Sequence, residues 1–359
     1  MATGELTRTD RFVNSALFVL LLVLGVSGVI MLYGVWQPWL FDLHRIAGFA
    51  LVALLPWKGL TIYRSLRRGM EKTLDRTVVL VLSIVFAHFI ALILVLAIMW
   101  TLRLGPYSSL TQTLIAWHWI LGLAIFPILA IHVWRRWPSP RKEDVASRRA
   151  FLKMGAVAAA GLAGGALANF VGRQQATDDR PRRFTGSRGF GEFTGNDFPV
   201  TGERPVRLDA DEWALVVRGA VDAPLTLTYD DVLGREAQTV TATIDCTNGW
   251  YSVQEWQGVP LMEVLREAGM ADKATGVRLT SVTGYNHTYP LAEAGKILLA
   301  THVSGEVLAP RHGFPVRAVV PDRRGWFWVK WLREVRVLDR YRDLVTGIAG
   351  SPFQVLRQF

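Results

Sequence analysis

Long runs of apolar residues dominate the first half of the chain, and short alternating runs dominate the second. Four apolar segments lie at about 12–35, 44–63, 77–101 and 113–134, and each is long enough to cross about 30 Å of hydrocarbon as an α-helix. A fifth and weaker run, rich in Ala and Gly, covers residues 154–170. The pattern predicts a multi-domain protein that begins with an all-α bundle of four transmembrane helices, followed by a fifth helix.

From residue 213 onward, short stretches rich in β-branched residues alternate with turns. The expected strands are ALVVRGAV (214–221), TVTATID (239–245), VRLTSVT (277–283), PVRAVVP (315–321) and EVRVLDR (334–340). Short helices are expected at Tyr229–Leu233 and Leu261–Glu267. This half of the chain is therefore predicted to be an α+β domain, mainly β, of about 150 residues.

Charge separates the same two halves. Residues 1–175 hold 18 Lys and Arg against 7 Asp and Glu, whereas residues 176–359 hold 22 against 23. The excess lies between apolar segments, as the positive-inside rule requires, so the amino terminus and the end of the fourth helix are expected to be cytoplasmic and nucleic acid is not an expected partner. The basic residues on the expected cytoplasmic side are Arg8, Arg11, Arg64, Arg67, Arg68, Lys72, Arg76, Arg135, Arg136, Arg141 and Lys142. Those on the opposite side of the membrane are Arg45 and Arg103.

Four histidines lie in the last three of the four helices: His44, His88, His118 and His132. His118 and His132 are 14 residues apart, which is about 21 Å and nearly four turns of one helix, so they are expected on one face. That spacing suits two stacked b-type haems with axial histidine pairs. We expect His44 and His118 to share an outer haem, and His88 and His132 an inner one.

Two alternatives to the haem interpretation stay open. The histidines could serve only as hydrogen-bonding residues between helices, or the bundle could serve only as a membrane anchor. Gly25, Gly28, Gly48 and Gly122 are expected to let a porphyrin approach the backbone. With its histidine pattern, this half is similar to membrane cytochrome b subunits, including the haem partner of the methionine-sulfoxide reductase system. The resemblance implies one or two b haems.

The only cysteine of the chain, Cys246, follows the β-type run 240–244 and precedes the turn residues Thr247, Asn248 and Gly249. A single thiol excludes an intrachain disulfide, a four-cysteine zinc site, an iron–sulfur cluster and a CxxCH haem attachment. A buried core residue is one remaining interpretation. A thiolate that binds a soft metal at the end of a strand is the other.

Three motifs accompany this cysteine: WQGVPL (256–261), HGFPVRAVVP (312–321) and WVKW (328–331). Over about residues 195–340 the chain resembles the sulfite-oxidase-fold molybdopterin oxidoreductases. The resemblance implies a molybdenum-molybdopterin cofactor with Cys246 as the molybdenum ligand. It also implies that Tyr285 lies beside the substrate oxygen. His287 is expected on the same loop, where it is either a second proton donor or an ordinary exposed histidine. The cofactor-binding residues that the resemblance implies are Asn196, Pro199, Val200, Ser281, His312, Arg317, Trp328, Val329 and Lys330.

Two departures from sulfite oxidases bear on the substrate. Where that family has basic residues for an anion, this chain has Gly195 and, after the cysteine, TNGW. It also ends about 20 residues beyond Asp339, without the immunoglobulin-like dimerisation domain. We therefore expect a monomeric, reductase-like member with a neutral or aromatic-lined pocket involving Trp250, Tyr251 and Trp326.

Between the two halves, the segment SRRAFLK (Ser147–Lys153) precedes the Ala- and Gly-rich run and resembles a twin-arginine export signal. Its twin arginines, Arg148 and Arg149, fall on the side expected to be cytoplasmic. The alternative is an ordinary fifth transmembrane helix with basic flanks. The pattern at Ala166–Ala168 is a possible cleavage site, but we expect an uncleaved anchor that places the second half on the periplasmic or extracellular side of the plasma membrane.

The combined hypothesis is a membrane-anchored molybdenum oxidoreductase that exchanges electrons with a quinone or cytoplasmic donor and reduces a small S-oxide or N-oxide. The alternatives are oxidation of a small sulfite-like substrate and, in another class, a cofactor-free binding module on an anchor. The expected divisions are 1–140 (cytochrome b-like), 141–172 (signal or anchor helix), 173–195 (linker), 196–340 (molybdopterin-binding) and 341–359 (tail).

Overall fold

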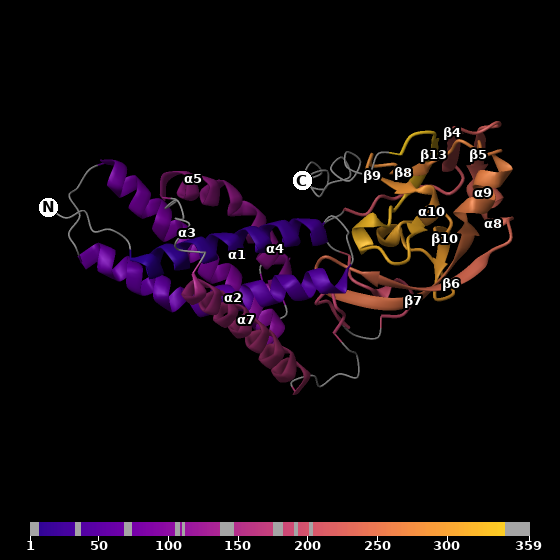
Figure 1. Ribbon diagram of the computed structural model, residues 1–359. Coiled ribbons are helices and arrows are strands. Elements are labelled where there is room, and N and C mark those ends of the chain that lie inside the picture. Colours follow the sequence, from indigo (N-terminus) through magenta and orange to yellow (C-terminus); the bar gives the residue numbers. More distant parts are fainter. Residues whose placement is uncertain are drawn as a thin grey trace. The chain divides into compact units, whose positions relative to one another are not determined.

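The chain folds into two compact units, the helical unit (Met1–Gly186) and the β-rich unit (Ser187–Phe359), shown in Figure 1. This computed structural model describes residues 7–32, 37–67, 74–104, 108–109, 112–136, 147–174, 182–189, 193–200 and 204–341. For some residues inside the helices it describes the backbone alone. The unit boundary falls inside the segment expected as a linker, and the finer division of the chain stays a prediction. The expected tail beyond Tyr341 and basic residues such as Arg68, Lys72, Arg141 and Lys142 lie outside the described residues.

Helices form almost all of the described part of the helical unit. They are α1 (Arg8–Leu32), α2 (Pro38–Arg67), α3 (Leu74–Thr101), α4 (Leu114–Ala124), α5 (Phe126–Arg136) and α7 (Arg148–Gln174), with a short strand pair, β1 (Ser108–Ser109) and β2 (Gln112–Thr113), before α4. Five stretches are long and apolar enough to cross a membrane: Arg8–Leu32, Pro38–Tyr63, Ile84–Thr101, Leu114–Ile131 and Arg148–Val171. These stretches confirm the five expected apolar segments. The side of the membrane on which each end lies stays a prediction.

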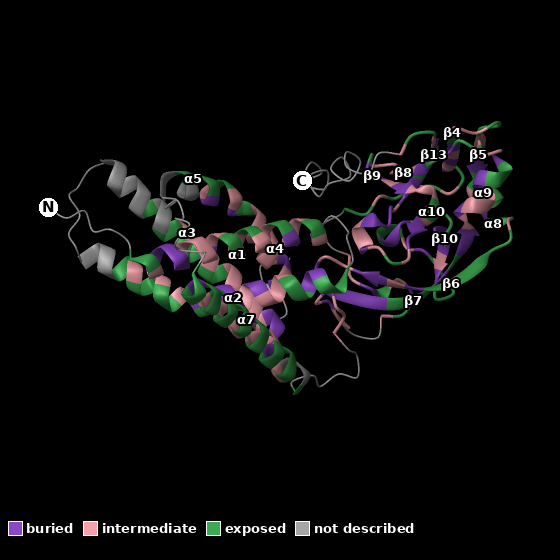
Figure 2. Cartoon of the chain, viewed as in Figure 1, coloured by how far each residue is buried: buried purple, intermediate pink, exposed green. Residues whose placement is uncertain are grey.

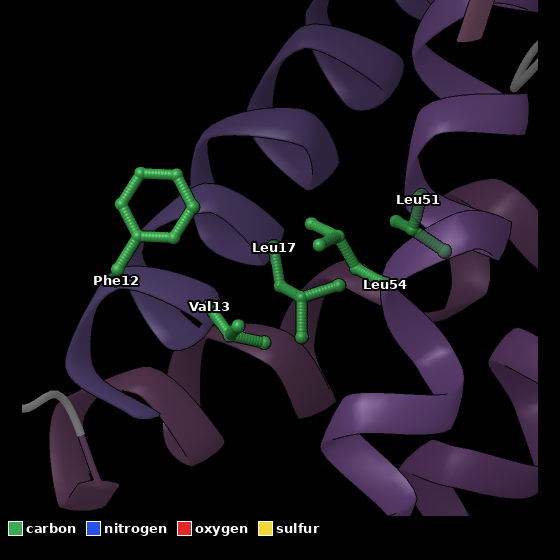
Figure 3. Packing of buried hydrophobic residues seen from close by; sticks show 5 residues of the cluster. All are labelled: Phe12, Val13, Leu17, Leu51 and Leu54. Atoms are coloured by element: carbon green, nitrogen blue, oxygen red, sulfur yellow. The ribbon is translucent and has the colours of Figure 1, made fainter. Parts of the chain in front are cut away.

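Packing in this unit buries a narrow seam and leaves the outer surface apolar. Phe12, Val13 and Leu17 of α1 pack with Leu51 and Leu54 of α2 (Figure 3). Large apolar side chains are exposed on the outer faces of the helices, where Figure 2 shows the exposed residues in green, and they include Leu22, Leu92 and Phe170. A bundle that exposes apolar side chains is suited to lipid, where helices associate through close packing rather than through the hydrophobic effect.

The fifth expected helix, α7, packs closely against α2. A Cβ atom on Gly161 would lie 2.6 Å from the carbonyl oxygen of Ile46, and one on Gly164 would lie 2.9 Å from Cβ of Phe49. Small residues at these two positions therefore allow the helices to approach. The Ala- and Gly-rich composition of this segment is explained by packing, whether or not it is also an export signal.

The fourth expected helix has one irregular position, Ile125, which keeps right-handed helical dihedral angles and whose carbonyl oxygen accepts from the Leu129 N–H at 2.8 Å. The helix is α4 up to Ala124 and α5 from Phe126. Pro127 has no N–H to continue the helical hydrogen bonds, which accounts for the irregularity at this point. The side chain of His132 lies outside the described residues, so the common face expected for His118 and His132 stays a prediction.

The β-rich unit contains two sheets joined by short helices. Its elements are β3 (Arg188–Gly189), η1 (Gly195–Asp197), β4 (Ala214–Gly219), β5 (Leu225–Thr228), α8 (Tyr229–Leu233), β6 (Gln238–Asp245), β7 (Trp250–Pro260), α9 (Leu261–Glu267), β8 (Gly276–Ser281), β9 (Asn286–Pro290), α10 (Leu291–Ala294), β10 (Leu298–Val303), β11 (Glu306–Val307), η2 (Pro310–His312), β12 (Arg317–Val319), η3 (Gly325–Phe327) and β13 (Leu332–Leu338). One sheet has the order β11-β10-β7-β3, with β12 paired to β10 and β6 paired to β7, and the other has the order β5-β4-β13-β8-β9. The five expected strands and both expected helices are confirmed.

The long strand β7 links the parts of the first sheet. Trp256 at its centre is fully buried, and its indole N–H donates to the carbonyl oxygen of Ala242 on β6 at 3.2 Å. A Cβ atom on Gly258 would lie 2.1 Å from the carbonyl oxygen of Leu299 on β10. Glycine is required at this position because β7 and β10 approach so closely there. The core of the unit thus forms around the WQGVPL motif.

Candidate functional site

Cys246 lies in the tight turn that joins β6 to β7, as expected for a thiol at a strand end. The Cys246 N–H donates to the carbonyl oxygen of Trp250, and the Gly249 N–H donates to that of Cys246, each at 2.9 Å. Gly249 has φ +82°, a left-handed conformation that glycine adopts without strain. The Asn248 N–H points to the sulfur at 3.4 Å. The turn therefore fixes the position of the thiol between two paired strands.

The surroundings of Cys246 require a cation if the thiolate is to form. Burial is the largest influence and raises the pKa of Cys246 to about 11, while the Asn248 N–H and the positive charges of Arg324 and Lys330 act in the opposite direction. Without a metal the group is a neutral thiol at pH 7. Because a metal ion stabilises the thiolate that ligates it, the position fits a metal-bound sulfur.

The HGFPVR motif forms a compact loop in which Gly313 separates two basic residues. Gly313 has φ +113°, and a Cβ atom there would lie 2.9 Å from Cβ of Arg317 and 3.2 Å from Cβ of Lys330. Arg317 Nη1 donates to the carbonyl oxygen of His312 at 2.9 Å. The structure thus brings His312 and Arg317 of this motif together with Lys330 of the WVKW motif.

Arg317 is fully buried among three aromatic rings. Its guanidinium carbon lies 5.0 Å from the ring centre of Trp256, 5.7 Å from that of Trp328 and 5.9 Å from that of Phe198. Cation–π contacts of this kind stabilise a desolvated guanidinium and restrict its direction. The indole N–H of Trp328 donates to the carbonyl oxygen of Arg323 at 3.1 Å, and Trp328 is therefore positioned as a core residue that orients Arg317.

His312 is buried and presents one ring nitrogen that has no partner among the described residues. Its Nε2 lies 2.7 Å from the carbonyl oxygen of Asn196 and 3.1 Å from Nε of Arg311. The carbonyl oxygen can only accept, so the shorter contact places the proton on Nε2 and leaves Nδ1 as an acceptor. Burial, and then the charge of Arg317, lower the pKa of His312 to about 3, which keeps the ring neutral.

The indole N–H of Trp250 is a second buried polar group without a partner in the described part of the chain. Trp250 packs against Phe193 and Phe198, with ring centres 6.0 and 6.1 Å apart. Buried polar groups are normally satisfied, so a donor at Trp250 and an acceptor at His312 Nδ1 indicate a polar ligand. Together with the basic side chains near Cys246, they fit a pterin with a phosphate.

Asn196 connects two segments of the site, and its contact with a cofactor stays a prediction. Its Nδ2 donates to Glu306 Oε2 at 3.0 Å and to the carbonyl oxygen of Val307 at 2.9 Å, and its Oδ1 accepts from the Ala309 N–H at 2.7 Å. The side chain therefore fastens the segment that leads into His312. Pro199 and Val200 lie next to it in the chain, half-buried, and their contact with a cofactor stays a prediction.

Tyr285 lies in a buried hydrogen-bond chain. Its hydroxyl donates to the carbonyl oxygen of Trp326 at 2.5 Å and accepts from His287 Nε2 at 2.7 Å. The residue before Trp326, Gly325, packs against the end of β6: a Cβ atom there would lie 3.2 Å from Ile244 Cγ1. Tyr285 is thus connected to the end of the strand that leads into the Cys246 turn, and its catalytic role stays a prediction.

The expectation that His287 is an exposed loop histidine is wrong. It lies on β9 with 3% of its surface exposed, and burial lowers the pKa of His287 to about 3. A neutral ring of this kind orients the Tyr285 hydroxyl. Ser281 and Val329 are also buried, with Ser281 Oγ accepting from Thr283 Oγ1 at 3.1 Å and the Val329 carbonyl oxygen from the Ala318 N–H at 2.8 Å.

In the helical unit, His44 of α2 and His118 of α4 lie side by side. Their ring centres are 6.1 Å apart and their planes cross at 84°. His44 Nδ1 lies 2.8 Å from Ser27 Oγ, and His118 Nδ1 lies 2.9 Å from the carbonyl oxygen of Ile93. The structure therefore brings together the two histidines that the sequence analysis paired.

The second expected pair is not seen together. His88 of α3 is exposed, and its Nδ1 lies 2.8 Å from the carbonyl oxygen of Ile84 in its own helix. His132 belongs to α5, but its side chain is outside the described residues. The inner pair stays a prediction.

Four residues at these sites escaped the sequence analysis: Ser27, Phe198, Glu306 and Arg324. Phe198 is the buried residue of the segment that supplied Asn196, Pro199 and Val200, and its apolar character was the available signal. The adjacent arginines 323 and 324 could have indicated a basic site near Cys246, but arginines are usually exposed, so the sequence did not distinguish a site residue from a surface charge. Ser27 and Glu306 have partners distant in the sequence, and nothing local marked them.

The β-rich unit matches known proteins over most of its length. A model of the family described as "Oxidoreductase molybdopterin binding domain" matches residues 201–345. The uncharacterized oxidoreductase YuiH of Bacillus subtilis (strain 168) is 37% identical over 144 residues, covering 39% of this chain and 73% of that protein. The chain belongs to the molybdopterin-binding oxidoreductase family. Its assignment as an enzyme of this type is thereby confirmed, and its mixed sheets have the sulfite-oxidase fold.

Two further relatives of this molybdopterin-binding oxidoreductase have named activities. Mitochondrial sulfite oxidase of Rattus norvegicus is 32% identical over 40% of this chain and 32% of its own length. The protein-methionine-sulfoxide reductase catalytic subunit MsrP of Xanthomonas campestris pv. campestris is 29% identical over 44% of this chain and 54% of its own. The chain thus spans about a third and about half of these two relatives. The family match leaves the helical unit untested, so its cytochrome b-like character stays a prediction.

Proposed function

We propose that this protein is a membrane-anchored molybdenum oxidoreductase that reduces a small S-oxide or N-oxide with electrons supplied through its helical unit. The observation that carries the proposal is the setting of Cys246, a half-buried thiol in a rigid turn near the charges of Arg324 and Lys330. The similarity to MsrP, which is named as a protein-methionine-sulfoxide reductase, supports an S-oxide as substrate. Such a reduction consumes two electrons and two protons and releases the thioether and water.

When bound, the molybdenum-molybdopterin cofactor supplies oxygen-atom transfer, and b haem supplies single-electron transfer. In this proposal Cys246 ligates the metal. His312 Nδ1, the Trp250 N–H and Arg317 line the pocket of the pterin, and Lys330 interacts with its phosphate end.

In the same proposal Tyr285 holds a proton for the substrate oxygen. His287 keeps the hydroxyl oriented, because its Nε2 donates to Tyr285 Oη at 2.7 Å. A hydroxyl positioned in this way is suited to general-acid catalysis, provided that the substrate oxygen comes within hydrogen-bond distance.

In this proposal His44 and His118 would together hold one haem iron. Metal–imidazole bonds are about 2 Å long and a ring nitrogen lies about 1 Å from its ring centre, so two imidazoles that bind one ion have ring centres up to about 6 Å apart. The observed separation is 6.1 Å. We propose this outer site as the first haem and retain His88 and His132 as a proposed second site.

Glycines near this pair support the same proposal. Gly48 and Gly122 each follow one of the two histidines by one helical turn; a Cβ atom on Gly48 would meet only Leu24, at 3.9 Å, and one on Gly122 nothing within 4 Å. Gly25 serves another purpose, because a Cβ atom there would lie 2.5 Å from the Phe126 ring. The helix surface beside each histidine is therefore open enough for a flat ligand.

The remaining parts of the proposal concern location and partners. We propose that α7 is retained as an anchor, since its glycines pack it against α2, and that the β-rich unit acts outside the cytoplasm of the cell. The proposed electron donor is a membrane quinol or a cytoplasmic donor. We also propose a monomer in contact with lipid, without nucleic acid.

One observation favours a second candidate function, the oxidation of a small anionic substrate with electrons delivered to the membrane. The sequence lacks the expected basic residues at Gly195 and after Cys246, yet Arg324 is buried beside Cys246 and its charge favours the thiolate. A cation in this place would also attract an anion. Arg324→Gln should therefore weaken the binding of an anionic substrate and leave the binding of a neutral S-oxide unchanged.

The test is cofactor analysis of the purified, detergent-solubilised chain, followed by assays. We expect one molybdenum, one pterin and one or two b haems per chain, with reoxidation of reduced haem by S-oxides or N-oxides. Cys246→Ala serves as the control that keeps haem but loses this reoxidation. Molybdenum without haem would reduce the helical unit to an anchor. The absence of both would refute the proposed function, and reduction of haem by sulfite would favour the second candidate.

A further inference from the structure

Ser27 is a buried polar residue of α1 that contacts a proposed haem ligand. It has 2% of its surface exposed. Its hydroxyl lies 2.6 Å from the carbonyl oxygen of Val23 and 3.2 Å from that of Leu24, both one turn earlier in the helix, and 2.8 Å from His44 Nδ1. A serine hydroxyl has a single proton, and the carbonyl oxygen can only accept it. Ser27 therefore donates to Val23 and accepts from His44.

This direction of the hydrogen bond fixes the tautomer of His44. If Ser27 Oγ accepts, the proton of the neutral ring is on Nδ1 and the lone pair is on Nε2. The same holds for His118, because its Nδ1 lies 2.9 Å from the carbonyl oxygen of Ile93, which can only accept. Both rings of the pair thus keep Nε2 as a lone-pair donor suited to a metal ion.

We propose that Ser27 is a positioning residue for the outer haem, which holds His44 in the Nδ1–H tautomer and increases the electron donation of its Nε2. The inference rests on the haem part of the proposed function. Partners of this kind orient a ligating histidine and raise its basicity, and their loss commonly weakens metal binding by about 10- to 100-fold. His118 is oriented by a backbone group, so Ser27 is the side chain through which substitution can alter the pair.

The experiment compares three variants of the full chain in detergent. Ser27→Ala removes the acceptor, Ser27→Thr retains a hydroxyl, and Ser15→Ala makes the same change on α1 at a hydroxyl that has no partner among the described residues. The measurements are haem per chain, the midpoint potential of each haem and the electron paramagnetic resonance signature of the oxidised haem. A weaker imidazole donor stabilises the ferric iron less, so Ser27→Ala should shift one potential upward and weaken haem retention by about 10- to 100-fold.

We expect Ser27→Thr to restore the wild-type potential and Ser15→Ala to leave it unchanged. A haem-containing Ser27→Ala variant with the wild-type potential and resonance signature would overturn the role of Ser27 alone. An equal shift in Ser15→Ala would also overturn it, because the effect would then be a general one of α1. A wild-type chain without haem would overturn the haem path and this inference together.

Discussion

Substituting Gly313 by alanine tests whether the HGFPVR loop positions the two basic residues of the candidate cofactor site. Gly313 has φ +113°, and a Cβ atom there would lie 2.9 Å from Cβ of Arg317 and 3.2 Å from Cβ of Lys330. Arg317 cannot move aside easily, because its guanidinium is enclosed by three aromatic rings and bonded to the His312 carbonyl oxygen. The added methyl group must therefore distort the loop.

Two separate terms contribute to the expected destabilisation. A non-glycine residue in such a backbone conformation costs about 1–3 kcal/mol. Overpacking of a filled site by one methyl group costs about 1–3 kcal/mol more. The free energy of unfolding of the β-rich unit should therefore fall by about 2–6 kcal/mol. Displacement of Arg317 and Lys330 should also lower the amount of molybdopterin that copurifies.

Gly305 provides a matched control in the β10–β11 turn. It has φ +81°, and a Cβ atom there would meet nothing within 4 Å, so Gly305→Ala carries the backbone term without the clash. The two variants should differ by about 1–3 kcal/mol, or roughly 2–12 °C in the midpoint for a domain of this size. Pulse proteolysis of the full-length protein on a temperature series, with the surviving β-rich fragment quantified on gels, measures the difference. Equal midpoints and equal molybdopterin contents in the two variants would refute the reasoning.

Three other predictions concern the two units separately. Cys246→Ala should abolish molybdenum content and oxide reduction while the reduced-minus-oxidised haem spectrum stays unchanged, and retained activity would rule out the metal-ligand role. His118→Ala should remove one haem without changing molybdenum content, and two unchanged haems would contradict the pairing with His44. Because burial lowers the pKa of His287 from its ordinary 6.5 to about 3, the unfolded state binds a proton that the folded state does not, and the free energy of unfolding should fall as pH decreases from about 6.5 toward 3. Urea midpoints between pH 7 and 4 should show a shallower decline in His287→Gln, and identical pH slopes would contradict the assignment.

The sequence by itself determined the class of each half, because the relevant signals are local. The length of an apolar run decides whether a helix can cross a bilayer, and five such stretches were found where they were expected. Strand alternation and turn residues located β6 and the Cys246 turn. The helix Tyr229–Leu233 was predictable because Thr228 and Asp231 form a capping box at its start. Pro127 was an equally local signal for the irregular position between α4 and α5, and the periodicity of the apolar run concealed it.

Tertiary structure alone decided what several site residues do. The cofactor contact of Asn196 stays a prediction, but the hydrogen bonds of its amide to Glu306–Ala309, more than 100 residues away, could not be seen in the sequence. His287 reads as a loop residue, yet the packing of β9 against η3 buries it. Ser27 carries no local signal, and its contact with His44 exists only because α1 and α2 pack together. Secondary structure follows from neighbouring residues, whereas protonation, burial and hydrogen-bond partners depend on which distant segments pack together.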